Sequence, residues 1–469
     1  MAPKKPVTPE YFRDKLTTVD ATGKRVWIYA KKIRGPHFTY RSIVAAFLLI
    51  LFYSGPFIKI HGDPIMLFDI LHRRFIIFGI AFWPQDFHLI LLSVITTIVF
   101  IVLFTVVFGR IFCGWVCPQT IFLEFVFRRI EYLIEGDAAA QRRRDNGPMN
   151  MDKLWRKTLK HVVFYVISLI TATTFLSYII GFDRVKHFLL DDPIAHWGSF
   201  SGLFVFAGAF YFIFAFFREQ VCTIACPYGR LQSVLVDKKT ILVAYDFVRG
   251  EPRGPLKLQK TENLGDCIDC NSCVVVCPTG IDIRNGTQME CINCTACIDA
   301  CDTIMTKVNK PKGLIRYDSE EGIKTGKHSI FNMRSIAYSV VLTLLLFFVA
   351  SLFMFRGNFE STILRASGSM YQNYGTDSLS NIYTFDMVNK TNRAIDVTFK
   401  VESMPGRIQY IGDHPPVEVG HIGKGTFLVI LPIKALHSSQ TTFKIGMYEE
   451  GNLIEMYKTS FVGPSSLDK

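Results

Sequence analysis

The sequence predicts a multidomain membrane protein with three kinds of structure: an α-helical membrane region, a small cysteine-rich α+β domain and a C-terminal all-β domain. Three observations predict this fold class. Five long apolar stretches interrupt the chain, all twelve cysteines gather in four groups, and the tail after Arg356 alternates between short apolar segments and turn residues. At 469 residues the chain is long enough for several domains.

The apolar stretches are long enough, or nearly so, to cross a bilayer as helices. They are Ile43–Ile58, Phe87–Phe108, Leu159–Ile180, Phe200–Phe217 and Ser335–Phe355. Composition agrees, because 49% of the residues are apolar and phenylalanine alone occurs 41 times. Buried helices of a soluble protein are the alternative, which five such stretches with basic flanks disfavour. We therefore expect five transmembrane helices.

The distribution of lysine and arginine predicts the orientation of these helices. The segment Met1–Arg41 holds ten of them and the loop Arg128–Lys160 holds nine, whereas Lys59–Asp86 holds three and Phe182–Ser199 holds two. The N-terminus and the region Arg218–Arg334 are thus expected inside, and the tail outside. The net charge of +12 then sets topology, and nucleic-acid binding is not expected.

Eight cysteines form two consecutive runs, each with the spacing x2, x2, x3. They are Cys267, Cys270, Cys273, Cys277 and Cys291, Cys294, Cys297, Cys301. This is the bacterial ferredoxin pattern for [4Fe–4S] clusters, in which the fourth cysteine of each run ligates the other cluster. Zinc knuckles are the alternative, but zinc sites favour two separated CxxC pairs. We expect a cytoplasmic α+β two-cluster ferredoxin-like domain.

In this crossed rule, the fourth cysteine of each run joins the first three cysteines of the other run. It divides the eight cysteines into two sets of four. One cluster is expected on Cys267, Cys270, Cys273 and Cys301, and the second on Cys291, Cys294, Cys297 and Cys277.

The remaining four cysteines, the corner cysteines, form the pairs Cys113/Cys117 and Cys222/Cys226, each followed by proline and placed just after an apolar stretch. They indicate an internal repeat of two spans plus a cysteine corner. The prolines place Cys117 and Cys226 at helix starts. Thiolates there suit a soft metal or electron exchange, so the site is expected to hold a copper ion or a further cluster. Small buried thiols packing a helix end are the alternative.

All twelve cysteines fall on the predicted inner side, where reducing conditions keep thiols free to bind metal. The tail holds none. It alternates in segments bounded by turn residues, which is typical of an immunoglobulin-like β-sandwich. The expected strands are Ile382–Val388, Ile395–Val401, Phe427–Leu431, Thr441–Met447 and Leu453–Phe461.

The predicted domains follow from these segments. They are a basic N-terminus (1–41), a four-helix membrane region with the first corner (42–217), the second corner with the two-cluster domain (218–334), a fifth transmembrane helix (335–355) and the β domain (356–469).

The chain resembles the CcoG/FixG/RdxA family of membrane polyferredoxins, accessory proteins of cbb(3)-type cytochrome c oxidase assembly. The resemblance covers nearly the whole chain. It rests on the two CxxxCP corners, the runs CIDCNSCVVVCPTGIDIRNG and ECINCTACIDACD, and PKGLIRY at Pro311–Tyr317. It implies a bacterial inner-membrane protein with a periplasmic β domain. It also implies a cupric reductase that supplies Cu(I) to the oxidase, with the corner cysteines in a catalytic or copper-binding role.

The resemblance implies partners as well: the lipid bilayer, a cytoplasmic electron donor, a copper chaperone or transporter and the oxidase assembly machinery. A homodimer is left open. Two other functions are considered. One is a quinol-oxidising electron-transfer subunit of the NapH type, which shares the CxxxCP corners. The other is a non-enzymatic copper carrier or assembly scaffold, for which clusters would be superfluous.

Overall fold

Two units make up the chain, Met1–Ala350 and Ser351–Lys469. The computed structural model describes residues 17–20, 22–60, 63–70, 74–78, 80–82, 86–190, 197–257, 264–326, 333–355, 359–366, 368, 370–389, 394–412, 416–418 and 422–464. Most of the first half of the predicted basic N-terminus therefore lies outside the described residues.

Six helical segments of the described chain are long and apolar enough to cross a membrane. They are Pro36–Phe57, Phe87–Phe108, Ile111–Ile134, Met151–Ile180, Trp197–Phe217 and Ser335–Met354. Five of them coincide with the predicted stretches, so the chain is a membrane protein. The sixth, Ile111–Ile134, was not predicted. It has the lowest mean hydropathy of the six, 1.2, and carries Cys113 and Cys117 near its start.

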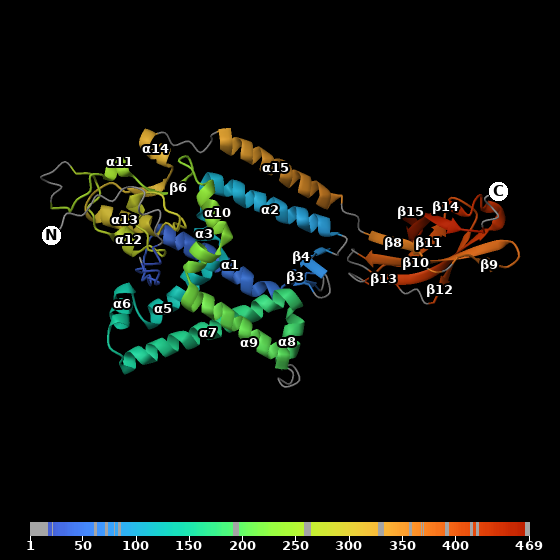
Figure 1. Ribbon diagram of the computed structural model, residues 1–469, viewed down its shortest axis with the longest axis horizontal. Helices are drawn as coiled ribbons and strands as arrows, with labels where there is room; N and C mark the ends of the chain where they lie inside the picture. The colour runs from blue at the N-terminus through green and yellow to red at the C-terminus, as the bar shows by residue number, and fades with distance from the viewer. Residues whose placement is uncertain are drawn as a thin grey trace. The chain divides into compact units, whose positions relative to one another are not determined.

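The first unit is mainly helical (Figure 1). Its α-helices are α1 (Pro36–Ser54), α2 (Phe87–Phe108), α3 (Ile111–Trp115), α4 (Pro118–Ile121), α5 (Arg128–Ile134), α6 (Ala138–Asn146), α7 (Met151–Ile180), α8 (Phe182–Leu190), α9 (Trp197–Phe212), α10 (Pro227–Leu235), α11 (Phe247–Gly250), α12 (Ser272–Val275), α13 (Ala296–Lys307), α14 (Glu320–Thr325) and α15 (Met333–Met354), which runs into the second unit. Segments of π-helix, η3 (Phe122–Phe127), η4 (Ile213–Phe217) and η5 (Val221–Ala225), lie beside the corner cysteines.

Short strands complete the first unit. Strands β1 (Lys59–Ile60) and β2 (Asp63–Pro64) pair, as do β6 (Leu242–Tyr245) and β7 (Ile315–Asp318), and β3 (Met66–Asp69), β4 (Arg74–Ile77) and β5 (Ile80–Phe82) form a three-stranded antiparallel sheet. The three-stranded sheet lies in the segment Lys59–Asp86, which the sequence indicated only as a loop. The β6–β7 pair packs with α12 and α13 around buried Leu314, Ile315 and Met305, giving the cysteine-rich domain an α+β core.

The cysteine-rich domain is tied to the membrane region at the start of α1. The buried carboxylate of Asp299, in the first turn of α13, accepts hydrogen bonds from the backbone N–H groups of His37 (3.3 Å) and Phe38 (2.8 Å). The first N–H groups of a helix have no partner within the helix, so a carboxylate there acts as a cap. A Cβ on Gly35 would lie 2.3 Å from the Asp299 Cγ, so this approach requires glycine.

Replacing Asp299 with alanine is expected to loosen the first turn of α1. Loss of a carboxylate cap costs about 1–2 kcal/mol, so amide exchange at the start of α1 should speed up by about tenfold. Hydrogen exchange of the peptide covering Pro36–Ser54 measures this, with the α9 peptide as internal reference. Asp299→Asn keeps the acceptor oxygen and should show a smaller change. Equal exchange in all three proteins would contradict the capping role.

The second unit is an antiparallel two-sheet β domain. One sheet has the order β12 (Arg407–Ile411), β13 (Ile422–Pro432), β10 (Ser378–Asn389), β8 (Phe359–Arg365), with β9 (Gln372–Tyr374) also on β10; the other has the order β11 (Val397–Val401), β14 (Gln440–Glu449), β15 (Asn452–Val462). All five predicted strands are present. Four lie within β10, β13, β14 and β15, and the predicted Ile395–Val401 begins two residues before β11. Strands β8, β9 and β12 were not predicted.

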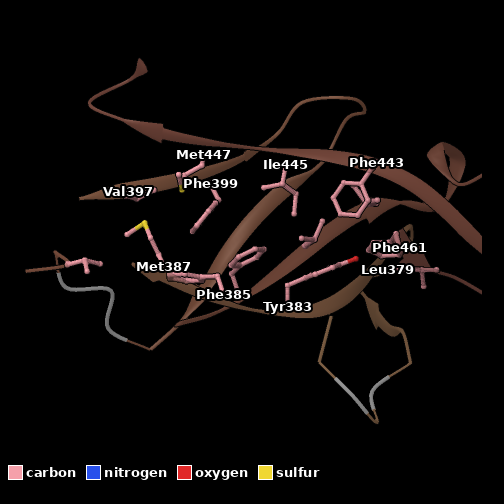
Figure 2. Packing of buried hydrophobic residues seen from close by; sticks show 14 of the residues in the cluster. Leu379, Tyr383, Phe385, Met387, Val397, Phe399, Phe443, Ile445, Met447 and Phe461 are labelled. Carbon is pink, nitrogen blue, oxygen red and sulfur yellow. The ribbon is translucent and has the colours of Figure 1, made fainter. Parts of the chain in front are cut away.

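The two sheets enclose an aromatic core. Figure 2 shows Tyr383 and Phe385 of β10 with Phe399 of β11 and Phe443 of β14, all less than a twentieth exposed. The Phe385 and Phe399 ring centroids are 4.9 Å apart, within the range of favourable aromatic pairs. The Tyr383 hydroxyl donates to the Ser460 carbonyl at 2.8 Å, so its buried polar atom is satisfied. This core holds the domain together without a disulfide.

Candidate metal centres

The two cysteine runs adopt the same backbone. In the first run Asp269 and Asn271 have φ of +52° and +56°, and at the equivalent positions of the second run Asn293 and Thr295 have φ of +52° and +63°. Asp and Asn tolerate this left-handed conformation better than most residues, whereas the β-branched Thr295 adopts it against its usual preference. Each loop then leads directly into a helix, α12 or α13. The two runs, which have equal cysteine spacing, therefore form loops with the same backbone conformation.

The eight thiols divide into two groups by proximity. Electrostatic contacts link Cys301 with Cys273, Cys270 and Cys267, although Cys301 is the last cysteine of the other run. They link Cys297 most strongly with Cys294, Cys291 and Cys277. These are the two sets that the crossed rule predicts. The structure thus brings every predicted cluster cysteine next to its expected partners.

A narrow cavity lies among the second set of thiols. It is lined by Cys277, Cys291, Cys294 and Cys297, by Cys273 from the first set, and by Val243, Thr279, Ile281, Ile283, Ile292 and Thr295. Burial in these surroundings raises the pKa of Cys291 to about 12 and of Cys294 to about 11. A thiolate there needs a nearby cation, which cluster iron would supply. Four soft donors around a cavity with mainly apolar walls fit a [4Fe–4S] cluster.

The corner cysteines lie at helix starts, as predicted. Cys117 is the N-cap of α4 and Cys226 the N-cap of α10, and in both helices proline follows at the first position. The repeat extends to the preceding turn. Gly109 (φ +57°, ψ −134°) and Arg218 (φ +49°, ψ −122°) each stand four residues before the first cysteine of a corner and share one unusual conformation. The two corners therefore share the preceding turn and the proline-led helix start, while Cys113 lies in an α-helix (α3) and Cys222 in a π-helix (η5).

The four corner thiols gather into one site. Cys222 has electrostatic contacts with Cys117, Cys113 and Cys226, so thiols from both corners meet. Within the described part of the chain, no three histidine, cysteine or acidic side chains are arranged to hold a single metal ion. A tetrahedral ion with bonds of about 2.3 Å would need its thiolates within about 4 Å of one another. The corner thiols therefore suit either an iron–sulfur cluster, whose ligands lie further apart, or a Cu(I) ion, which needs fewer than four thiolates.

The corner site lies directly against the loop that carries Cys291 and Cys294, which we call the cluster loop. Cys113 packs with Ile292 and Cys294 in one apolar cluster. A Cβ on Gly114 would lie 2.4 Å from the Ile292 carbonyl oxygen, so the two backbones touch at this point. Glycine is the residue that permits such an approach. Corner and second cluster set are therefore neighbours.

Polar contacts reinforce this junction. The Trp115 indole donates to the Tyr317 hydroxyl (3.1 Å), which donates to the Asn293 carbonyl (3.3 Å). The Arg41 Nε of α1 donates to the Gly114 carbonyl at 3.0 Å. Tyr317 ends the PKGLIRY stretch, so that stretch connects corner and cluster loop. Sequence reasoning assigned no role to these side chains. Trp115 stands between Cys113 and Cys117, but its partner Tyr317 is 202 positions away in the chain.

Arg110 is the most informative residue that the sequence reasoning missed. Its side chain is buried, with one nitrogen donating to the Met289 carbonyl. The guanidinium interacts electrostatically with Cys113 and Cys222 of the corner and with Cys291 of the second cluster set. A fixed positive charge between two groups of thiolates offsets their mutual repulsion. Its position three residues before Cys113 was the available signal.

A buried ion network anchors the corner helices. The Arg218 guanidinium donates to Glu131 of α5 at 2.6 Å, and Lys160 of α7 lies 3.8 Å from Glu131 and 3.1 Å from Glu135. All four side chains are buried. Paired charges of this kind are tolerated in a low-dielectric interior, whereas an unpaired one is costly. The network explains how Ile111–Ile134 carries charges and still packs inside the helical region.

Comparison with known proteins agrees with these features. Family models for a 4Fe-4S dicluster domain, a 4Fe-4S binding domain and the IG-like fold at the C-terminus of FixG match residues 217–320, 90–135 and 348–464. Protein RdxA of Cereibacter sphaeroides is 31% identical over 94% of this chain and 98% of its own length. The chain belongs to the FixG/RdxA family.

Other members of the FixG/RdxA family match as well. Protein RdxB of Cereibacter sphaeroides is 32% identical over 84% of this chain and 86% of its own, and the nitrogen fixation protein FixG of Rhizobium meliloti is 36% identical over 63% and 57%. A crystal structure of a FixG-related protein from Vibrio parahaemolyticus covers 23% of this chain and 97% of its own, with 17% identity and a TM-score of 0.20. The family member described here is an iron–sulfur electron-transfer protein.

Proposed function

We propose that this FixG/RdxA family member is a membrane oxidoreductase that reduces Cu(II) to Cu(I) for the assembly of a cbb(3)-type cytochrome c oxidase. The observation that carries the proposal is the junction of the corner with the cluster loop, where Gly114 meets Ile292 and Cys113 packs against the apolar cluster that contains Cys294. The corner site, which would take the metal ion, is thus in contact with the cluster loop, which would supply the electron. Each Cu(II) ion accepts one electron and leaves as Cu(I).

The corner residues suit the product of this reaction. Thiolates are soft ligands that favour Cu(I), so two of the four corner thiolates (Cys113, Cys117, Cys222 and Cys226) would hold the reduced ion. The Arg110 charge beside them keeps the assembled thiolates from repelling one another. The [4Fe–4S] clusters, when bound, take up and release single electrons. A copper chaperone or transporter and the oxidase assembly machinery would be the partners on the copper side, and a cytoplasmic donor would supply the electrons.

We assign one cluster to Cys267, Cys270, Cys273 and Cys301 and the second to Cys291, Cys294, Cys297 and Cys277. The proximity of the thiols within each set supports this assignment.

We further propose five membrane crossings, with the N-terminus and clusters in the cytoplasm and the β domain in the periplasm of a bacterial inner membrane. Of the six apolar helical segments, Ile111–Ile134 is the one that we expect not to cross the membrane, and its contacts support this. Its start lies against the cluster loop at Gly114, and just beyond its end Asp137 accepts from the Lys32 backbone at 2.8 Å. Lys31 in turn donates to Val275 beside Cys273 and Cys277. Both ends of this helix therefore contact the same side of the protein.

Copper reduction is tested anaerobically with the purified full-length protein. Its clusters are reduced and Cu(II) is added with a Cu(I) chelator, while absorbance reports both cluster oxidation and the chelate. Wild-type protein should form one Cu(I) per electron held. Cys226→Ala should keep the cluster absorbance but lose Cu(I) formation, because the corner can no longer hold the ion. Thr223→Ala, between the two cysteines of the same corner, is the matched control and should behave as wild type.

Other outcomes assign other functions. Reduced clusters that ignore Cu(II) yet respond to a quinone would refute copper reduction and favour a quinol-oxidising subunit of the NapH type. A copper carrier or assembly scaffold would give two results together. The cluster-free Cys267→Ala/Cys291→Ala protein would still bind copper stoichiometrically, and the wild type would not reduce it.

A further inference from the structure

Two buried arginines lie beside the second cluster set. Arg41 of α1 and Arg110 are only 4% and 6% exposed. Within the described chain their hydrogen bonds go to carbonyl oxygens and to no carboxylate: Arg41 donates to Gly114 at 3.0 Å, and Arg110 donates to Met289. A guanidinium stays protonated in proteins, so each side chain is a fixed positive charge inside the fold.

Both charges act on thiols of the second set. Arg41 has an electrostatic contact with Cys294, and Arg110 has one with Cys291. The carboxylate of Glu124 also acts on Cys294, but an arginine four residues further along the chain is paired with it. The surroundings of the second set therefore carry an excess of positive charge.

The surroundings of the first set have the opposite sign. Arg284 has an electrostatic contact with Cys273, but its guanidinium is paired with two carboxylates, Asp282 at 2.6 Å and Asp269. A third carboxylate, Asp302, acts on the last thiol of this set. One guanidinium and three carboxylates leave an excess of negative charge.

Solvent differs between the two sets as well. Cys270 and Asp269 are exposed, so water near the first set screens the charges there. Around the buried arginines the effective dielectric constant is about a quarter of that of water, and a charge acts about four times as strongly. Water also stabilises added negative charge, but it must reorient to do so, whereas the two guanidiniums are already in place.

We propose that Arg41 and Arg110 are positioning residues that raise the reduction potential of the second cluster above that of the first, so that an electron from the cytoplasmic donor is held next to the corner. Reduction adds one electron, makes or breaks no bond, and increases the negative charge among the four thiolates, which nearby positive charge favours. The inference rests on the proposed division of the thiols between two clusters and does not depend on copper as the substrate.

The potentials are measured on full-length, cluster-loaded protein without copper, by anaerobic titration with dithionite and redox mediators followed by EPR. Wild-type protein should show two one-electron steps at different potentials. Arg41→Gln removes the charge but keeps a donor for the Gly114 carbonyl. It should lower the higher potential by at least about 59 mV, a tenfold change in the reduction equilibrium, and move the lower one by less than half as much. Arg41→Lys keeps the charge and should restore most of the loss.

Arg129→Gln is the matched control. The Arg129 guanidinium lies over the same Phe125 ring as that of Arg41, at 5.5 Å from the ring centroid against 5.2 Å, but it donates to the Ser42 hydroxyl at 2.8 Å and not to the corner. This variant should leave both potentials unchanged. Arg110→Gln removes the other charge and should lower the same potential as Arg41→Gln, which provides a second variant if Arg41→Gln folds poorly. Iron content and visible absorbance establish that each variant holds its clusters.

A protein with one cluster identifies which cluster responds. The Cys267→Ala/Cys301→Ala protein should keep the second cluster, with the higher of the two potentials, and Arg41→Gln should lower that potential further. Loss of both clusters from this protein would refute the division of the thiols and the inference with it. Three results would overturn the inference alone: a remaining cluster with the lower potential, equal shifts of both clusters in the full protein, or equal effects of Arg41→Gln and Arg41→Lys.

Discussion

Removing Cys301 and Cys267 together is expected to cost the protein no more iron than removing either one alone. Both thiols lie in the same proximity group, so the double variant loses one cluster, or about four irons per chain. Cys301→Ala/Cys297→Ala changes two cysteines of one sequence run but of different groups, and should lose about eight irons. Iron analysis of the purified full-length variants measures both losses.

The comparison of these two double variants decides how the ligands are divided. If each run held its own cluster, Cys301→Ala/Cys297→Ala would be the variant that spares a cluster and the other would lose both. The EPR signal of the reduced protein gives a second measurement, because two neighbouring reduced clusters interact magnetically and one cluster alone does not. Cys113→Ala serves as a control, since it should leave both signals in place.

Gly114→Ala is expected to disconnect copper reduction from the clusters while leaving both in place. The added Cβ would lie 2.4 Å from the Ile292 carbonyl oxygen, a distance that forces one backbone to move. The loop that carries Cys291 and Cys294 must then retreat from Cys113. Since a displacement of this kind costs about ten- to a hundredfold in rate, Cu(I) formation should slow at least tenfold. Iron content should stay at the wild-type level.

Gly202→Ala is the matched control for this experiment. Gly202 is also helical, in α9, but a Cβ there meets nothing within 4 Å. Alanine favours a helix over glycine, so this variant should be at least as stable as the wild type. Full activity of Gly114→Ala would show that the contact with Ile292 does not carry the electron path. Loss of iron in Gly114→Ala would show that the contact serves the folding of the cluster loop instead.

Local patterns made most of the fold and both candidate metal centres predictable. The cysteine spacing predicted the cluster loops around Asn271 and Thr295, and the following prolines predicted the helix starts at Cys117 and Cys226, because each of these features is decided by a few consecutive residues. The five predicted strands of the tail were found because each is a short apolar segment bounded by turn residues. The edge strand β12 was missed, because its side chains alternate between partly buried and exposed and none is fully buried.

Contacts between distant residues were out of reach. The hydrogen bond from Trp115 to Tyr317 joins residues 202 positions apart, and no single sequence contains that information. The helix Ile111–Ile134 was overlooked because Arg128 and Glu131 lower its hydropathy. Their charges are compensated by Glu124, Arg218 and Lys160, residues that the pattern of one helix does not reveal. The role of Arg110 depends on three thiols that only the folded chain brings near it.

The matching turns at Gly109 and Arg218 bear on the ancestry of the chain. Each half contributes only two thiols, yet all four meet in one place. A half-length ancestor would have needed two identical copies, side by side, to collect the same four. Joining two genes would then have made a symmetric pair into one molecule whose halves were free to diverge. The two halves now differ at this turn: Gly109 is a residue suited to the conformation, whereas Arg218 contributes a charge that pairs with Glu131 and holds the helices together.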